Sequence, residues 1–237
     1  MKGLLIAFAG EAGAGKDTAA SVLVGVHGFV PVALADPLKR MCQDAFLFTD
    51  SQLWGESANR NKEDGRYPRG EVDGKMQYLT PRYALQQLGT EWGRKCYPNV
   101  WTDYVLRVYN KLQDGDNYYS QTMGLRPCWG VGENLRPKKH VVIADVRFRQ
   151  EVEELKRAGA FVVRVRRRVV FPGLRGYELE HSSENGLREV DPDLFDDVID
   201  NTESLETFQQ AVGVRFRNVW LRRLEDAREE GDRKVSR

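Results

Sequence analysis

The sequence predicts an α/β protein whose parallel sheet is covered by helices on both faces. Strand-like segments alternate with helix-like ones along the chain, which is the order that a parallel sheet with crossover helices requires. The segments at residues 4–9 and 140–145 are apolar runs, as expected of strands that are buried on both faces. Five strands are expected, at residues 4–9, 29–34, 140–145, 161–165 and 197–200.

Helices are expected between these strands. The first follows a glycine-rich turn and covers residues 16–24. The second starts at Asp36-Pro37, with Asp36 as the N-cap and Pro37 at the first helical position. Three more are expected after Thr80-Pro81, from Phe148 to Ala158, and along an apolar stripe from Leu205 to Leu224.

Two polar stretches interrupt the alternation. Residues 55–78 are rich in Gly, Asn, Arg and Asp and are expected to form a long loop or insertion, and residues 113–139 form a second irregular stretch. The 237 residues suffice for one domain of moderate size. We therefore expect a single domain with core segments at about 1–34, 140–168 and 190–225.

The composition is that of an ordinary globular protein. The net charge of +1 gives no electrostatic case for binding nucleic acid or a membrane surface. Cys42, Cys96 and Cys128 are widely spaced and form neither a CxxC pair nor a zinc pattern, which favours a reduced, cytoplasmic protein. No signal peptide and no apolar run of membrane-spanning length is expected.

Residues 10–17, Gly-Glu-Ala-Gly-Ala-Gly-Lys-Asp, predict a phosphate-binding P-loop between the first strand and the first helix. The glycines leave room for backbone N–H groups to converge on an anion, and the helix adds its positive end. Lys16 supplies a mobile cation for the β- and γ-phosphates. Where the motif asks for Ser or Thr to hold Mg²⁺, this chain has Asp17, which can hold a metal-bound water, followed by Thr18, which can reach a phosphate. The candidate nucleotide-binding residues are Gly10, Ala12, Gly13, Ala14, Gly15, Lys16, Asp17 and Thr18.

Asp145 ends the strand that we expect beside the P-loop strand. Ligands gather at the carboxyl ends of such strands, where an acid can organise Mg²⁺ or position the attacking oxygen of an acceptor. The alternative is that Asp145 caps the next helix. Arg147 and Arg149 follow, and one of them can place a cation on the migrating group. A solvated helix start is the alternative, and it suits Arg149 better.

A cluster of arginines follows the next strand, at Arg164, Arg166, Arg167 and Arg168. Such a run is consistent with a solvated rim or with a mobile, arginine-bearing lid beside a triphosphate, and we weigh the two equally. His181 can act as a general base, although a lone His is more often structural.

Residues 85–94 place amide, hydroxyl, carboxylate and guanidinium groups just after a helix, with Trp92 and Trp101 nearby. Such groups can read a base edge, clamp a phosphate and stack on a ring. Arg94 and Lys39 are our candidates for clamping an acceptor phosphate. The alternative for both tryptophans is core or rim packing.

These motifs together resemble those of the bacteriophage deoxynucleoside monophosphate kinases, within the P-loop nucleoside-monophosphate kinase superfamily. The matching pieces are residues 10–18, 35–39, 85–94 with Trp101, 143–148, 181–184 and 198–201. The Leu-Gly-Thr-Glu…Gly-Arg element is the most specific of them, and the Gly-Lys-Asp-Thr variant of the P-loop is common in this family.

The resemblance implies transfer of a phosphoryl group from ATP to a deoxynucleoside monophosphate, with Mg²⁺. It implies the P-loop kinase fold, with a five-stranded parallel sheet, a monophosphate-binding region at about residues 35–112 and a lid at about 168–189. The implied metal residues are Asp17 and Asp145, and the implied catalytic residues are Lys16, Asp145, Arg147 and Arg168. The implied substrate-binding residues are Asp36, Lys39, Gln87, Glu91, Arg94 and Trp101. It leaves the preferred base open, including a modified pyrimidine. A homodimer through the C-terminal helix is also implied, although packing on its own sheet explains the apolar stripe equally well.

Two other functions compete with this one. A P-loop kinase of another small phosphorylated acceptor, such as dephospho-coenzyme A or phosphomevalonate, needs no base pocket, so Gln87, Glu91 and Trp101 argue against it. A nucleotide-binding module without catalysis would not need Asp145 and Arg147. A GTPase should carry an Asn-Lys-x-Asp element, which the sequence lacks.

Overall fold

The computed structural model describes residues 2–115, 139–167, 186–187 and 190–219. Arg168 and His181, with most of the predicted lid, lie outside the described residues, as do residues 116–138 of the predicted insertion and the end of the predicted C-terminal helix. No helix within the described ranges is long and apolar enough to cross a membrane.

Five parallel strands form the central sheet, in the order β2-β5-β1-β6-β7. Their bounds are Leu5–Ala9 (β1), Val30–Val32 (β2), Val141–Val146 (β5), Phe161–Arg166 (β6) and Asp197–Asp200 (β7). The predicted fold class is therefore confirmed. Ala9 at the end of β1 pairs with Val146 at the end of β5, so the P-loop and Asp145 start from neighbouring strand ends, as predicted.

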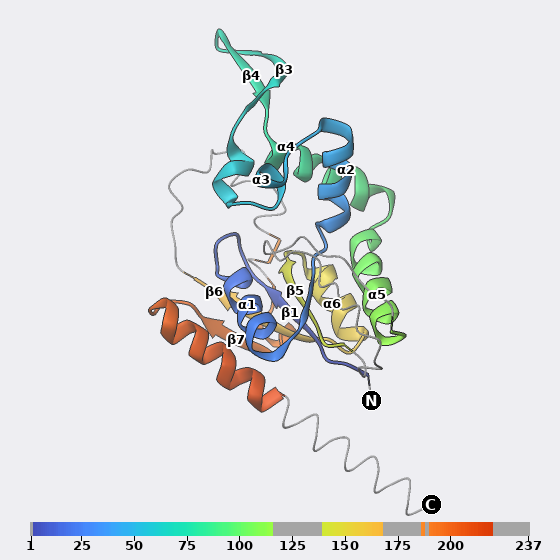
Figure 1. Ribbon diagram of the computed structural model, residues 1–237, viewed down its shortest axis with the longest axis vertical. Coiled ribbons are helices and arrows are strands. Elements are labelled where there is room, and N and C mark those ends of the chain that lie inside the picture. Colours follow the sequence, from blue (N-terminus) through green and yellow to red (C-terminus); the bar gives the residue numbers. More distant parts are fainter. Residues whose placement is uncertain (1, 116–138, 168–185, 188–189, 220–237) are drawn as a thin grey trace, which may run out of the picture.

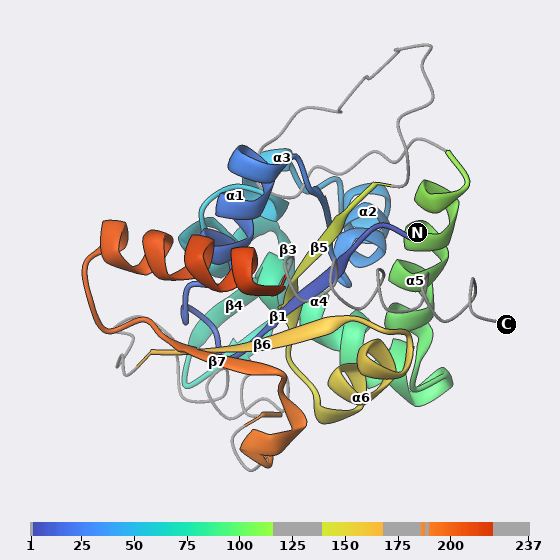
Figure 2. The same ribbon diagram turned by 90° about the horizontal axis from the view of Figure 1, so that it is seen from below.

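Helices cover both faces of this sheet. Figure 2 shows α1 (Lys16–His27) and the helix at residues 205–219 on one face, with α5 (Val100–Gln113) and α6 (Arg149–Arg157) on the other. Side chains of β1 alternate between the two cores, as strand geometry requires. Ile6 and Phe8 join the cluster that contains α1, whereas Leu5 and Ala7 join the one that contains α5 and α6.

The helix at residues 205–219 packs its apolar stripe on the sheet. Phe208, Val212 and Phe216 are buried in the same cluster as α1. Packing on its own sheet therefore accounts for the stripe, and the homodimer stays a prediction.

A second, smaller core lies beyond the carboxyl ends of the strands (Figure 1). Cys42, Phe48, Leu53 and Ala84 are its buried residues. The elements around it are α2 (Asp36–Phe46), α3 (Asp50–Leu53), the 3-10 helix η1 (Ser57–Asn61), α4 (Pro81–Gln86) and the π-helix η2 (Gln87–Arg94). One more 3-10 helix, η4 (Pro192–Leu194), precedes β7.

Residues 55–78 were predicted as a long loop or insertion, and the loop alternative is wrong. This stretch contains η1 and a β-hairpin of β3 (Asp64–Val72) and β4 (Lys75–Leu79), which projects from the body of the protein (Figure 1). Asp73 and Gly74 form its two-residue turn with φ values of 50° and 72°, the positive values that a type I′ turn needs. The strands were missed because both are largely exposed and lack an apolar face.

The prediction that Asp36 is the N-cap of the second helix is also wrong. Helix α2 starts at Asp36 itself, and Ala35 occupies the N-cap position without a side-chain bond. The Asp36 carboxylate instead accepts the backbone N–H of Ala33 at 3.1 Å, so it stabilises the turn that precedes the helix. Thr80 does cap α4, because its hydroxyl accepts the N–H of Tyr83 at 3.1 Å.

Candidate active site

The turn between β1 and α1 can be built only with glycine at two positions. A Cβ at Gly10 would lie 2.4 Å from the carbonyl oxygen of Val165. A Cβ at Gly15, whose φ is 105°, would lie 2.4 Å from the Asn201 Nδ2. The loop is therefore held close to the strand ends, and α1 begins directly after it with its positive end.

Lys16 places a buried cation inside this loop. The side chain is only 6% exposed, and its Nζ donates to the carbonyl oxygens of Gly10 at 2.8 Å and Glu11 at 2.7 Å. A glycine cradle, a helix N-terminus and a buried ammonium group together suit a phosphate group.

Asn201, which follows β7, fixes the far side of the loop. Its Nδ2 donates to the carbonyl oxygen of Ala14 at 2.9 Å, and its backbone N–H donates to the carbonyl oxygen of Arg166 at 2.7 Å. Asn201 belongs to a segment that resembles the kinase family, but the resemblance implied no role for it. The geometry makes Asn201 a positioning residue for the P-loop.

A cavity of about 180 Å³ lies next to the loop, between the strand ends and the smaller core. Its charged lining residues are Asp17, Lys39, Arg60, Arg82, Arg94, Asp145 and Arg147. Among the residues that the structure describes, five cations against two carboxylates make the lining strongly basic, which suits an anionic ligand. The cavity brings together six residues predicted from sequence: Asp17, Lys39, Arg94, Trp101, Asp145 and Arg147.

Asp145 connects the end of β5 to the turn before α2. Its Oδ1 accepts the N–H of Leu34 at 2.9 Å, and its Oδ2 accepts the N–H of Ala35 at 2.9 Å. Burial raises the pKa of the Asp145 carboxyl to about 6, against the two backbone donors, which lower it. Asp145 is thus bonded to the turn before α2 rather than to the start of α6.

The Glu151 carboxylate bonds the backbone at the start of α6 and also pairs with Arg94. Its Oε1 accepts Arg94 Nη2 at 2.5 Å, and its Oε2 accepts the backbone N–H groups of Arg147 at 2.9 Å and Phe148 at 3.1 Å. Arg94 Nη1 donates to Gly89 at 3.0 Å, and its guanidinium carbon lies 4.1 Å from the centre of the Phe148 ring. Arg94 is therefore a fixed part of the cavity wall.

Arg60 and Arg82 line the cavity although the sequence did not single them out. Arg60 donates to the carbonyl oxygens of Leu53 at 3.1 Å and Gly55 at 3.2 Å. Burial lowers the pKa of Arg60, and the neighbouring cations Arg82 and Arg147 lower it further. Arg60 comes from the stretch taken as a loop, so only its packing reveals it.

Arg82 is held by neutral groups. Its Nε donates to Asn61 Oδ1 at 2.5 Å, and its Nη2 donates to Ser57 Oγ at 2.9 Å. Thr80-Pro81 predicted the helix start correctly, but no local pattern indicated that the next residue would face a cavity.

Lys39 lies half-buried in the same cavity wall as these arginines. Its Nζ lies 5.7 Å from the centre of the Trp54 ring. Burial lowers its pKa, while Asp36, Asp145 and Asp17 act in the opposite direction. Its ammonium group therefore lies within the field of both cavity carboxylates.

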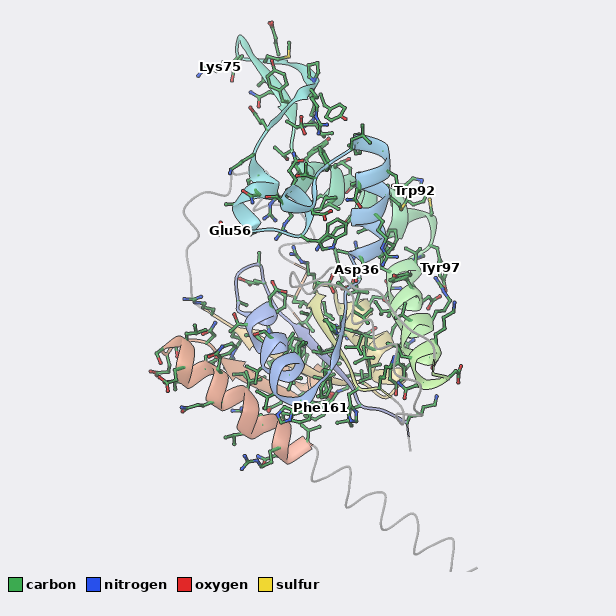
Figure 3. The ribbon with its side chains drawn as sticks, viewed as in Figure 1. Asp36, Glu56, Lys75, Trp92, Tyr97 and Phe161 are labelled. Atoms are coloured by element: carbon green, nitrogen blue, oxygen red, sulfur yellow. The ribbon has the colours of Figure 1, made fainter. Side chains whose placement is uncertain are left out.

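Three predicted substrate residues do not line the cavity. Glu91 pairs with Lys95 at 2.5 Å on the surface, and Gln87 lies outside the lining while its neighbour Gln86 is part of it. Residues 87–94 form a π-helix, whose i→i+5 bonding rotates side chains away from the positions that an α-helix gives them. The third, Asp36, lies buried at the start of α2 (Figure 3).

The two tryptophans have opposite environments. Trp92 is 52% exposed and lies on the outer side of η2 (Figure 3). Trp101 is 5% exposed, lines the cavity and donates its Nε1 hydrogen to Gly89 at 2.8 Å. Only Trp101 is therefore placed to contact a ligand.

Two carboxylates, Asp17 and Asp145, line the cavity on the P-loop side. Among the residues that the structure describes, no group of three or more His, Cys, Asp or Glu side chains could hold a metal ion. A divalent cation here would take most of its oxygen ligands from phosphates and water, which suits Mg²⁺.

Two arginines of the predicted run, Arg164 and Arg166, make structural contacts. Arg164 donates to the carbonyl oxygen of Leu187 at 2.9 Å, and Arg166 forms an exposed ion pair with Asp200 at 2.8 Å. Leu187 is itself buried in the main core, at the end of the predicted lid.

Fold and site together define an α/β protein with a P-loop and an adjoining basic cavity. No protein-family model matches the chain. A protein of Acanthamoeba polyphaga mimivirus named "Putative deoxynucleotide monophosphate kinase" is 29% identical over 209 residues, which cover 88% of this chain and 94% of that protein.

Solved structures give weaker similarities. A dephospho-CoA kinase from Campylobacter jejuni is 10% identical, with a TM-score of 0.46 over 91% of this chain and 96% of that one. A sugar kinase from Janibacter is 12% identical, with a TM-score of 0.43 over 88% of this chain and 91% of that one.

Proposed function

We propose that this chain is a deoxynucleoside monophosphate kinase. It transfers the γ-phosphoryl group of ATP to a deoxynucleoside monophosphate and releases ADP and the diphosphate. One observation carries the proposal: a glycine-rich loop with a buried lysine adjoins a separate cavity with five basic side chains. Transfer between two phosphorylated ligands needs two such anion sites side by side, and the similarity to the mimivirus protein supports the same reaction.

The P-loop side holds the donor. The backbone N–H groups at the start of α1 and the Lys16 ammonium group bind the β- and γ-phosphates of ATP. Lys16 leaves its carbonyl partners in the loop to do so. Mg²⁺, when bound, neutralises phosphate charge, and Asp17 and Asp145 are the side chains that would hold it or its water ligands.

The cavity holds the acceptor. Lys39, Arg60, Arg82 and Arg94 provide the positive charge for its phosphate, and Trp101 provides an apolar wall for its sugar or base. Arg147 lines the same cavity two residues after Asp145, and its positive charge stabilises the group in transfer. Arg168 stays a candidate for the same role.

The test is a coupled ADP-release assay with ATP and Mg²⁺. The acceptors are dTMP, dGMP, dCMP, dAMP, 5-hydroxymethyl-dUMP and 5-hydroxymethyl-dCMP. Dephospho-coenzyme A serves as the outgroup. We expect turnover with one or more deoxynucleotides and none with the outgroup. Turnover with dephospho-coenzyme A alone, or ADP release at the same rate with and without an acceptor, would contradict the proposal.

A further inference from the structure

Gln86, the last residue of α4, has an unusual environment in the cavity wall. The residue is only 8% exposed and lines the cavity. Its Nε2 is buried and has no hydrogen-bond partner among the described residues. Buried side-chain amides are nearly always hydrogen-bonded, so an unsatisfied one beside a cavity indicates a partner that binds there.

Other buried polar atoms of the region do not share both properties. Trp54 Nε1 also lacks a partner within the described chain, but Trp54 packs against the smaller core and does not line the cavity. Trp101 lines the cavity, but its Nε1 is bonded to Gly89. Gln86 therefore combines a position in the cavity wall with an amide nitrogen that has no partner in the described part of the chain.

The residues around Gln86 indicate which part of a ligand it meets. Arg82 precedes it by four residues on the same helix, so the guanidinium and the amide lie on one face of α4, one turn apart. Leu85 and Trp101 add apolar surface to the same wall. A ligand on this face meets a cation at one point and a neutral donor–acceptor pair with apolar neighbours at the next.

We propose that Gln86 recognises the base of the acceptor nucleotide. This inference rests on the proposed kinase function and adds a specificity-determining residue to it. The side-chain amide offers one acceptor oxygen and an NH₂ donor, and the pairing edge of a nucleobase offers a donor beside an acceptor. Because no protein group in the described part of the chain fixes the amide, it can turn to match the base.

The chemistry of the amide predicts how two substitutions differ. Gln86→Met keeps the length of the side chain but removes both hydrogen-bonding groups. Gln86→Glu keeps the shape and becomes acceptor-only when it is ionised. Guanine presents two adjacent donors on its pairing edge, so it is the base that an acceptor-only side chain can still match.

The experiment compares wild type, Gln86→Met and Gln86→Glu for kcat/KM on dAMP, dGMP, dCMP and dTMP, and for inhibition by 2-deoxyribose 5-phosphate, which lacks a base. We expect Gln86→Met to lower kcat/KM for the preferred deoxynucleotides about tenfold while the KM for ATP stays unchanged. Inhibition by the baseless phosphate should stay at the wild-type value. Gln86→Glu should raise the preference for dGMP over the other acceptors about tenfold relative to wild type.

Two controls separate recognition from folding. Gln86→Met removes an amide that lacks a protein partner, so its thermal midpoint without ligand should equal or exceed that of wild type. Gln77→Met makes the same chemical change on β4, outside the cavity, and should leave the base preferences unchanged.

Each failure has its own signature. A wild-type protein that phosphorylates no deoxynucleotide would overturn the kinase function, and this inference with it. A wild-type protein that is active, with a Gln86→Met variant that leaves kcat/KM unchanged or weakens the baseless phosphate as much as the nucleotides, would overturn the role of Gln86 alone.

Discussion

Arg94 and Glu151 join the two sides of the cavity: Arg94 Nη2 lies 2.5 Å from Glu151 Oε1, and both groups are largely buried. Arg94 ends η2 on the acceptor side, whereas Glu151 lies in the first turn of α6. The second oxygen of the same carboxylate holds the backbone at Arg147. One carboxylate therefore sets the positions of the Arg94 guanidinium and of the backbone at Arg147, two residues that line the cavity.

Replacing Glu151 with Ala should destabilise the protein and weaken the acceptor site. Removing one partner of a buried ion pair leaves the other charge uncompensated, which costs about 3 kcal/mol or more. We expect that loss in the free energy of unfolding, measured with urea. We also expect the variant to have a higher KM for the monophosphate than the wild-type protein has. Arg149→Ala, which breaks the exposed Arg149–Glu153 pair, is the matched control and should destabilise the protein far less, because exposed ion pairs contribute little to stability. An equal loss in both variants would contradict the role of burial.

Lys16→Met should remove catalysis while the fold stays intact. The substitution keeps most of the buried volume but removes the ammonium group that acts on the phosphate charge in the transition state. We expect kcat to fall about 100-fold or more, because the loss of one stabilising donor commonly has that effect. Circular dichroism and the thermal midpoint show whether the variant is folded. A folded variant with wild-type kcat would remove the P-loop from the mechanism.

Local sequence signals predicted the parts of the fold that depend on neighbouring residues. The apolar runs at residues 4–9 and 140–145 predicted β1 and β5, and a strand was predicted at residues 197–200, where β7 lies in the structure. The hairpin of β3 and β4 was missed because exposed strands carry no apolar signal, although Asp73-Gly74 is a common hairpin turn. Apolar runs therefore predict buried strands, whereas exposed strands have no comparable signal in the sequence.

The site divides in the same way. Lys16 and Asp145 could be found because each occupies a fixed place relative to a strand end. Arg60 and Gln86 could not, because their place in the wall depends on how η1 and α4 pack on each other. The choice of Gln87 instead of Gln86 shows the limit: a single step along the chain moves a side chain to another face of its helix.

Asn201→Ala should weaken ATP binding without affecting the acceptor. The substitution removes the donor that holds the Ala14 carbonyl, so the P-loop loses an anchor to β7. We expect the KM for ATP to rise about fivefold, the effect of roughly one lost hydrogen bond, with the KM for the monophosphate unchanged. Gly15→Ala should be more damaging, since its Cβ would collide with Asn201 Nδ2 and its φ is 105°. Equal increases in both KM values for Asn201→Ala would contradict a role confined to the P-loop.

The stability of the protein should carry a pH dependence that comes from Asp145. Burial raises the pKa of this carboxyl to about 6 from its ordinary value of 3.8, so the folded state holds the proton to higher pH than the unfolded chain does. Between these two values the folded state binds more protons, and the contribution of Asp145 to stability falls as the pH rises, until it is fully lost above about pH 6. Asp145→Asn does not titrate and lacks this fall. Thermal midpoints of both proteins, measured without nucleotide or Mg²⁺ from about pH 4 to about pH 7, should therefore move in favour of the variant as the pH rises and level off near neutrality. A difference between the two midpoints that stays constant over this range would mean that the carboxyl at Asp145 titrates at its ordinary pKa.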